Sequence, residues 1–308
     1  MRVVFFGSPE FAVSSLAAVA ERYQVAAVVT QPDRPAGRGG KLQIPAVKAM
    51  ALGKGLSVLQ PTKLRDGVLA HELAALSPDL FVVVAYGRIL PPDLLAVPRF
   101  GPWNVHASVL PKLRGAAPIQ WAVIRGEEVT GVSIMRMEEG LDTGPVAAQA
   151  TEVISTSDTA GTLSDRLAPL GARLLLETLP KIVEGSIVLR AQDHLAATLA
   201  PPLEKTDGQL DFGQPASAVS ARARGVDPWP GATAIIEGEA AKLFVPTVVA
   251  GQGVPGEFLG LFPQGMVIAC GEGAVAFGEV QMPSRKRMPA KALLAGRPIR
   301  PGTRFGAG

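Results

Sequence analysis

The side chains best suited to chemistry in this sequence lie in the segment Trp103–Ser108, which reads WNVHAS. If this segment is an extended strand, side chains two positions apart share a face, so Asn104 and His106 point the same way. A neutral amide can donate a hydrogen bond to a developing oxyanion, and an imidazole can transfer a proton near neutral pH. Taken alone, the segment also fits a histidine with a purely structural hydrogen bond, and that alternative stays open.

A carboxylate that could complete this pair lies further along the chain, in the segment Gly140–Pro145. Its Asp142 lies between two glycines, and an aspartate in such a setting is usually a turn residue. If Asp142 instead reaches the imidazole of His106, it can orient the ring and stabilise its cationic form. The three residue types suit hydrogen bonding and proton transfer at one site, provided that the fold brings them together.

The elements that must position these residues are visible as alternating strand-like and helix-like segments. Apolar runs predict strands at Val3–Phe6, Val25–Thr30, Leu80–Ala85 and Gly131–Met137. Leucines at helical spacing predict helices over Leu64–Leu76 and from about Asp158 to Leu174. This alternation indicates an α/β fold in which a Rossmann-like, mostly parallel sheet carries helices on both faces. We expect the functional site in the crevice at the carboxyl ends of its strands.

Two local features near the N-terminus carry further expectations. Ser8 precedes Pro9 and Glu10 and is predicted to cap the helix that they begin. The stretch Gln31–Gly40 is rich in proline and glycine, so we expect an exposed loop without regular structure.

The pattern changes after about residue 190, where short strand-like runs follow one another. One helix is predicted over Ala216–Arg224, and strands follow at Ala232–Ile236, Ala241–Val245, Met266–Cys270 and Ala274–Val280. We therefore predict a catalytic domain over residues 1–190, a linker over 191–206 and a smaller, OB-like C-terminal β-barrel domain over 207–308. Gly251–Gly256 has the spacing of a dinucleotide-binding motif, but no helix pattern follows it, so we expect a hairpin turn.

The composition excludes several classes of protein. The chain has 308 residues with one Cys and three His, which excludes a disulfide scaffold and a zinc ribbon and argues against a multi-histidine metal centre. We therefore expect no metal. No apolar run approaches the roughly 18–20 residues of a membrane span, so we expect a cytoplasmic protein without membrane contact.

Positive charge is concentrated in two regions, although the net charge is only +3. Residues 284–308 carry +7 without any acid, and Gln31–Lys48 carries +3, which leaves −7 on the rest of the chain. A basic run is often no more than a solvated surface. Two such regions on an otherwise acidic chain favour a polyanionic partner such as a nucleic acid.

Motifs spread over nearly the whole length of the chain resemble one family. They are Gly7–Phe11, Gln31–Gly39, Val84–Leu90, Asn104–Pro118, Leu141–Gly144 and Asp227–Ala232. In these motifs the sequence resembles the methionyl-tRNA formyltransferases, which are folate-dependent formyltransferases. The resemblance implies transfer of a formyl group from 10-formyltetrahydrofolate to the amino group of charged initiator methionyl-tRNA, for translation initiation. It implies folate and tRNA as partners and indicates no obligate protein partner.

The resemblance also implies roles for individual residues. Asn104, His106 and Asp142 fall on the family's catalytic positions. The folate-contacting segment falls on Ser108, Val109, Leu110 and Pro111, and Tyr86 and Gly87 are expected beside the pterin. The tRNA is expected at Arg34, Arg38 and Lys41 in the first basic region and at Arg285, Lys286 and Arg287 in the second. Gly40 stands where the family commonly has a lysine, which weakens the expectation for the first region.

The chemistry of the implied reaction suits the three catalytic candidates. An amine attacks a formyl carbon, and Asn104 can stabilise the resulting oxyanion by about 3–4 kcal/mol where water is excluded. His106 can carry a proton from the amine to the folate nitrogen, a contribution of roughly 10²–10⁴-fold in rate. Two alternatives stay open: the same reaction on a small sugar-amine or purine-precursor acceptor, and a non-catalytic RNA-binding protein on the same scaffold.

Overall fold

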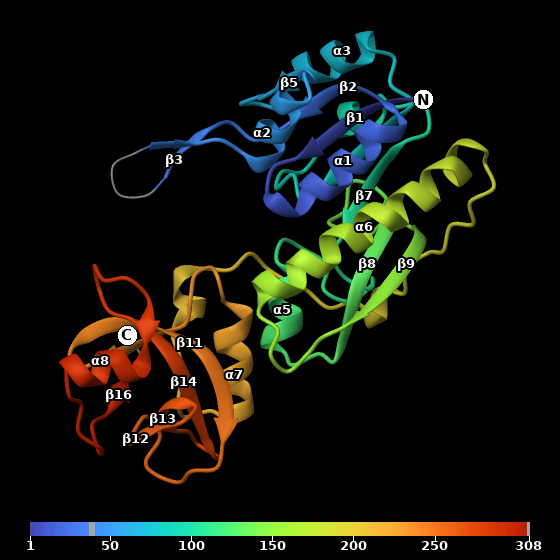
Figure 1. Cartoon of the computed structure of the whole chain (residues 1–308). Helices are drawn as coiled ribbons and strands as arrows, with labels where there is room; N and C mark the ends of the chain where they lie inside the picture. The colour runs from blue at the N-terminus through green and yellow to red at the C-terminus, as the bar shows by residue number, and fades with distance from the viewer. Residues whose placement is uncertain (37–40, 307–308) are drawn as a thin grey trace. The chain divides into compact units, whose positions relative to one another are not determined.

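The computed structural model describes residues 1–36 and 41–306, which form two compact units (Figure 1). The first unit comprises Met1–Pro118, Val129–Val153 and Ser164–Pro201, and the second comprises Ile119–Glu128, Ile154–Leu163 and the chain from Pro202 onward. The units therefore alternate along the sequence, because two segments that precede residue 164 belong to the second unit. The sequence predicts that the chain passes only once from one domain to the other, between residues 190 and 207. These predicted domain bounds stay a prediction.

A seven-stranded sheet forms the centre of the first unit, with the strand order β5-β2-β1-β6-β7-β8-β9. The strands are β1 (Arg2–Gly7), β2 (Gln24–Val29), β5 (Val58–Leu59), β6 (Leu80–Val84), β7 (Pro102–His106), β8 (Val129–Arg136) and β9 (Val146–Val153). Neighbouring strands from β5 to β7 are parallel, whereas β8 and β9 are antiparallel to their neighbours. The predicted mostly parallel α/β fold is confirmed.

Helices cover both faces of this sheet, and they are α1 (Val13–Arg22), α2 (Ala46–Gly53), α3 (Val68–Ala75), α4 (Pro92–Leu95) and most of α6 (Ala160–Val183). Helix α5 (Pro118–Ile124) lies almost wholly in the second unit. Side chains of α3 and α4 share a core cluster with Val83 of β6. Val83 is the register partner of Asn104, so Asn104 points to this face and Val105 to the other. There, Gly171 of α6 lies so close to Val105 that an added Cβ would be 2.9 Å away. No helix in the described ranges is long and apolar enough to cross a membrane.

Two expectations near the N-terminus are wrong. Pro9, and not Ser8, precedes a 3₁₀ turn at Glu10–Ala12, and the Ser8 hydroxyl accepts a hydrogen bond from the Gln31 backbone at 3.0 Å. The stretch Gln31–Gly40 is not wholly irregular, because its residues Arg34–Ala36 form β3, which pairs antiparallel with β4 (Lys41–Gln43), while residues 37–40 lie outside the described residues. Strands of three residues are too short to show a period of two in the sequence.

An antiparallel sheet with the order β12-β13-β14-β11-β10-β16 forms the centre of the second unit, and β15 pairs with β14. The strands are β10 (Thr233–Ile236), β11 (Glu239–Val249), β12 (Phe258–Phe262), β13 (Gly265–Ala269), β14 (Ala274–Gln281), β15 (Met288–Pro289) and β16 (Phe305–Gly306). The same unit contains the helices α7 (Ala216–Gly225) and α8 (Ala290–Gly296). Hydrogen bonds from Phe258 N to Thr303 O (2.9 Å) and from Phe305 N to Gly256 O (2.7 Å) join the two ends of this order. The sheet therefore closes into a barrel. Gly251–Gly256 leads from β11 into β12 and not into a helix.

Candidate active site

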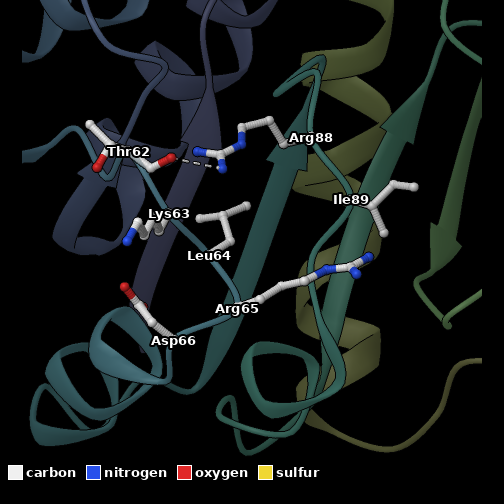
Figure 2. A pocket seen from close by; sticks show the side chains of 7 residues that line it. All are labelled: Thr62, Lys63, Leu64, Arg65, Asp66, Arg88 and Ile89. Atoms are coloured by element: carbon white, nitrogen blue, oxygen red, sulfur yellow. Dashed lines mark hydrogen bonds between the residues drawn. The ribbon is translucent and has the colours of Figure 1, made fainter.

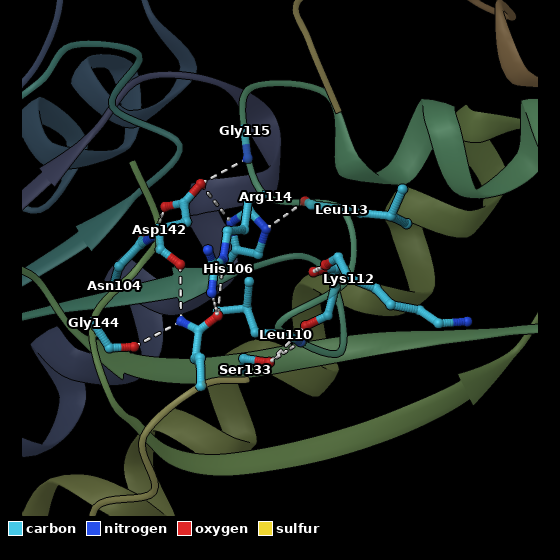
Figure 3. Close-up of polar contacts among 12 residues, drawn as sticks. Asn104, His106, Leu110, Lys112, Leu113, Arg114, Gly115, Ser133, Asp142 and Gly144 are labelled. Atoms are coloured by element: carbon cyan, nitrogen blue, oxygen red, sulfur yellow. Dashed lines mark hydrogen bonds and ion pairs between the residues drawn. The ribbon is translucent and has the colours of Figure 1, made fainter. Parts of the chain in front are cut away.

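The three residues predicted to be catalytic meet at the carboxyl end of β7 (Figure 3). The Asn104 side-chain nitrogen lies 3.4 Å from Oδ1 of Asp142, and His106 Nδ1 lies 3.6 Å from Oδ2 of the same carboxylate. Asn104 and His106 approach this carboxylate from one face of β7, and Asp142 itself lies in the turn between β8 and β9. The structure thus brings an amide, an imidazole and a carboxylate into one cluster.

The orientation of the His106 ring follows from its partners. Nε2 lies 2.9 Å from the Leu113 carbonyl oxygen, and a carbonyl can only accept, so Nε2 carries a proton and donates it. Nδ1 is therefore the nitrogen that faces the Asp142 carboxylate. The side chain of His106 is only 5% exposed and that of Asp142 13%, so solvent screens this pair weakly. Nδ1 is the position at which the ring can gain or lose a proton.

The Asp142 carboxylate is held by the backbone of a neighbouring loop. Gly115 N donates to Asp142 Oδ2 at 2.8 Å, a charge-assisted hydrogen bond. The φ angle of Asp142 is +52°, a left-handed conformation that aspartate tolerates better than most residues. The same turn needs a glycine at position 144, because an added Cβ would lie 1.9 Å from the Arg136 carbonyl oxygen at the end of β8.

Residues 190–200, which we call the strap, run along these loops and overlap the predicted linker over residues 191–206, whose bounds stay a prediction. The Arg190 backbone exchanges two hydrogen bonds with that of Val146, at 2.8 and 2.9 Å. Thr198 accepts from the backbones of Leu113 and Arg114, at 2.9 and 2.8 Å. The strap therefore belongs to the scaffold of the site. Sequence reasoning missed it because its polar residues show no periodic pattern.

The predicted folate segment divides into buried and partly exposed residues. Ser108 is fully buried and its hydroxyl donates to the Lys112 carbonyl at 2.6 Å, so this hydroxyl is already engaged within the chain. Leu110 is also buried, and its backbone nitrogen donates to Ser133 Oγ at 3.1 Å. Val109 and Pro111 are partly exposed. Contact with folate stays a prediction for this segment, and Val109 and Pro111 are its residues that a ligand can reach directly.

Tyr86 and Gly87 form a tight turn after β6. The Tyr86 ring is buried and packs edge-on against Phe6, with ring centroids 5.4 Å apart. Burial raises the pKa of the Tyr86 phenol, and the nearby charge of Arg88 opposes part of that rise. Gly87 has a φ of +77°, and an added Cβ would lie 3.1 Å from the side-chain nitrogen of Gln31. Both residues shape the end of β6, and their place beside a pterin stays a prediction.

A hollow that sequence reasoning did not indicate lies beside this turn (Figure 2). Its volume is about 580 Å³, and its lining comprises Thr62, Lys63, Leu64, Arg65, Asp66, Arg88 and Ile89. Arg88 donates to the carbonyls of Pro61 and Thr62 at 2.9 and 3.1 Å, which fixes its positive charge in place. Lys63 and Arg65 are exposed. Three cations against one carboxylate make this hollow a suitable site for an anion.

A second hollow of about 540 Å³ continues from the first, because Arg65 and Ile89 line both. Its other lining residues are Leu90, Pro91, Pro92, Asp93 and Glu139. Glu139 lies three positions before Asp142, and Leu90 lies three positions after Gly87. Both hollows are thus lined in part by residues that are close in the sequence to Gly87 or Asp142.

The basic residues predicted to bind tRNA differ in their surroundings. Arg34 donates to the Gln31 side chain at 2.9 Å, whereas Arg38 lies outside the described residues and only the backbone of Lys41 is described. Arg287 pairs with Glu279 and lies over the Phe244 ring, 4.1 Å from its centroid. Arg285 and Lys286 are exposed. The role of all six in tRNA binding stays a prediction.

Two known protein families match the chain, one over its N-terminal part and one over its C-terminal part. The family described as "Formyl transferase" matches residues 1–179, and "Formyl transferase, C-terminal domain" matches residues 202–298. A methionyl-tRNA formyltransferase from Myxococcus xanthus is 47% identical over 302 residues, which cover 98% of this chain and 97% of the relative. One from Desulfotalea psychrophila is 48% identical over 302 residues, covering 97% of this chain and 94% of the relative.

Solved structures with a similar fold come from more distant proteins. HypX from Aquifex aeolicus in complex with tetrahydrofolic acid has a TM-score of 0.65 and 19% identity, over 96% of this chain and 47% of HypX. This chain thus spans about half the length of HypX. WlaRD, a sugar 3N-formyl transferase solved with dTDP and 5-N-formyl-THF, has a TM-score of 0.67 and 17% identity, over 93% of this chain and 99% of WlaRD. At these identities the likeness concerns the fold.

Proposed function

Because the chain belongs to the methionyl-tRNA formyltransferase family, we propose that Asn104, His106 and Asp142 form its catalytic centre. There a formyl group passes from 10-formyltetrahydrofolate to the amino group of methionyl-tRNA. The observation that carries this proposal is the convergence of the three side chains on one point from β7 and a turn far along the chain. A structural histidine would need only the Leu113 carbonyl and no carboxylate at its second nitrogen.

Each side chain has a separate task in this reaction. As the amine nitrogen bonds to the formyl carbon, the carbonyl electrons move to oxygen, and the Asn104 amide donates to that oxyanion. His106 takes one proton from the attacking amine at Nδ1, while Nε2 stays bonded to Leu113. The electrons of the oxyanion then re-form the C=O bond, the bond from the formyl carbon to the folate nitrogen breaks with its electrons passing to that nitrogen, and His106 gives that nitrogen the proton. Asp142 holds the ring and stabilises its cationic form between the two transfers.

The first hollow is mainly cationic and the second holds Asp93 and Glu139, and this difference in charge favours one orientation of the folate. The folate carries carboxylates at the end opposite its pterin, and Lys63, Arg65 and Arg88 offer a cationic surface for them. The hollow between these cations and Glu139 is bordered by apolar Ile89 and Leu90 and by two prolines, which suits an aromatic linker. In this arrangement the pterin end lies toward Gly87 and the Asp142 turn.

Arg65→Ala is expected to raise the KM for 10-formyltetrahydrofolate about two- to fivefold, the effect of losing about 0.5–1 kcal/mol from an exposed ion pair. The increase should be larger for a polyglutamylated folate than for the monoglutamate, because the longer tail carries more carboxylates. The kcat at saturating folate should not change. Lys54→Ala, which removes an exposed cation outside the hollow, serves as the control. An equal effect of both variants would contradict this placement of the tail.

Formyl transfer measured with several acceptors tests the proposed function as a whole. The purified protein with 10-formyltetrahydrofolate should formylate methionyl-tRNA far faster than free methionine or a sugar amine. Raising the salt from about 50 to about 200 mM should increase the KM for methionyl-tRNA steeply, because phosphate contacts release counterions, and should change the KM for folate much less. Transfer to the sugar amine without transfer to methionyl-tRNA would favour a small acceptor, and no transfer to any acceptor would favour the non-catalytic alternative.

A further inference from the structure

Gln192 of the strap uses every polar atom of its side chain beneath the Asp142 turn. Its Nε2 donates to the carbonyl oxygens of Asp142 and Gly144, at 2.8 and 2.7 Å. Its Oε1 accepts from Nε and Nη2 of Arg114, at 3.0 and 2.8 Å. Gln192 is 8% exposed and Arg114 is 6% exposed. Two buried polar side chains thus form a hydrogen-bonded bridge between the loop of Gly115 and the turn of Asp142.

The partners fix the orientation of this bridge. A guanidinium can only donate and a carbonyl can only accept, so the amide oxygen of Gln192 faces Arg114 and its nitrogen faces the turn. Arg114 is itself held in place, because its backbone bonds to the strap at Thr198 and Ala200, at 2.8 and 2.7 Å. The next residue, Gly115, donates to the Asp142 carboxylate. Backbone and side chain of the same short loop therefore hold the Asp142 turn from two sides.

This double hold matters because the conformation of Asp142 is strained and its geometry is demanding. A φ of +52° costs a non-glycine residue free energy that the surroundings must supply. Gln192 binds the carbonyls on both sides of Thr143, which are the groups that would turn away if the strain relaxed. The Asp142 carboxylate lies 3.6 Å from His106 Nδ1, so a small rotation of the turn would separate the two.

We propose that Gln192, oriented by Arg114, is a positioning residue that sets the Asp142 carboxylate against His106 for formyl transfer. The inference rests on the proposed function of this site and adds residues to it that act through Asp142. It assigns the strap a role in turnover, whereas a linker would have none.

Gln192→Leu is expected to lower kcat by about 10–100-fold, since misplacement of a reacting group by about 1 Å can cost 10²-fold. The KM values for folate and methionyl-tRNA should stay within about twofold, because Gln192 is buried and offers no surface to a substrate. In a second variant, Gln192→Glu, the side chain can still accept the hydrogen bonds of Arg114. Its other carboxylate oxygen then faces the carbonyl oxygens of Asp142 and Gly144 and cannot donate to them. This variant should show the same loss if the first variant folds poorly. Thr178→Val removes a buried hydrogen bond of α6, at 2.6 Å, and should leave kcat unchanged.

A double-variant comparison separates positioning from general damage. If Gln192 acts only through Asp142, then Gln192→Leu should lower kcat little further in a protein that already carries Asp142→Ala. The ring nitrogen signals of His106 in a ¹⁵N spectrum give a readout that needs no turnover, since the chain has three histidines to assign. The Nδ1 signal should shift in Gln192→Glu and not in Thr178→Val.

The outcomes distinguish this inference from the proposed function. If the wild-type protein did not formylate methionyl-tRNA, but Gln192→Glu still shifted the His106 signal relative to the wild type, the function would be rejected and the positioning of Asp142 would stay supported. Losses of kcat that multiply in full with that of Asp142→Ala, or an unchanged His106 signal in the Gln192 variants, would overturn the inference.

Discussion

His106→Ala is expected to lower the kcat of formyl transfer to methionyl-tRNA by roughly 10²–10⁴-fold, the usual contribution of a positioned acid–base group. The loss arises because alanine has no atom at the Nδ1 position that can take the proton of the amine and return it to the folate nitrogen. The ring is 5% exposed, so it offers little surface for binding energy and the KM for folate should change little. Steady-state kinetics with saturating folate, across a range of methionyl-tRNA concentrations, measure both effects.

A second substitution controls for the damage that this change does to the core. Alanine leaves a cavity at a buried position and an unpaired carbonyl at Leu113, which lowers stability. His106→Gln retains an amide that can donate to that carbonyl but does not exchange a proton near neutral pH. It should unfold at a higher temperature than His106→Ala and lose kcat to a similar degree. If His106→Gln kept its kcat within about tenfold of the wild-type value, His106 would act by hydrogen bonding and not by proton transfer.

The parts of the site that the sequence predicted are those that depend on local geometry. Asn104 and His106 share a face because a strand repeats every two residues, and this holds wherever the strand lies in the sheet. The buried strand β6 was recognisable from its continuous apolar residues. The placement of Asp142 beside them came from the resemblance to a family, since no pattern in the sequence relates residues 38 positions apart.

The parts that the sequence did not predict depend on contacts between distant segments. Gln192 meets Asp142 across 50 residues and looks like any polar residue after a helix. The hollow at Arg65 is lined by residues 62–66, which form a series of bends outside any helix or strand. The helix predicted from Leu64 begins only at Val68, after Gly67 with a φ of +75°. Strand β12 received no predicted bounds because a glycine at position 260 interrupts its short run, where the pairing register with β13 also shifts.

Asp142→Asn is expected to lower kcat by about 10³–10⁴-fold, up to the roughly 10⁴-fold loss for an aspartate that orients a catalytic histidine elsewhere. Asparagine has nearly the same volume and tolerates the φ of +52°, so the turn should keep its shape. Gly115 N requires an acceptor at the Oδ2 position, so the amide oxygen takes that place and faces His106 without a charge. The amide nitrogen then takes the Oδ1 position and meets another donor, Asn104 Nδ2, which was 3.4 Å from the carboxylate.

The loss from Asp142→Asn should therefore have two sources, a less stable imidazolium and a displaced oxyanion donor. Asp158→Asn provides a matched control, because Asp158 is a buried carboxylate of the second unit that accepts from Ser155 N at 2.7 Å and Thr162 Oγ1 at 3.0 Å. It should lower the unfolding temperature and leave kcat nearly unchanged. Single-turnover rates with bound folate and methionyl-tRNA compare the two variants at the chemical step. Equal rates would mean that the carboxylate at position 142 serves only the fold of its turn, and the charge on His106 would then need another source of stabilisation.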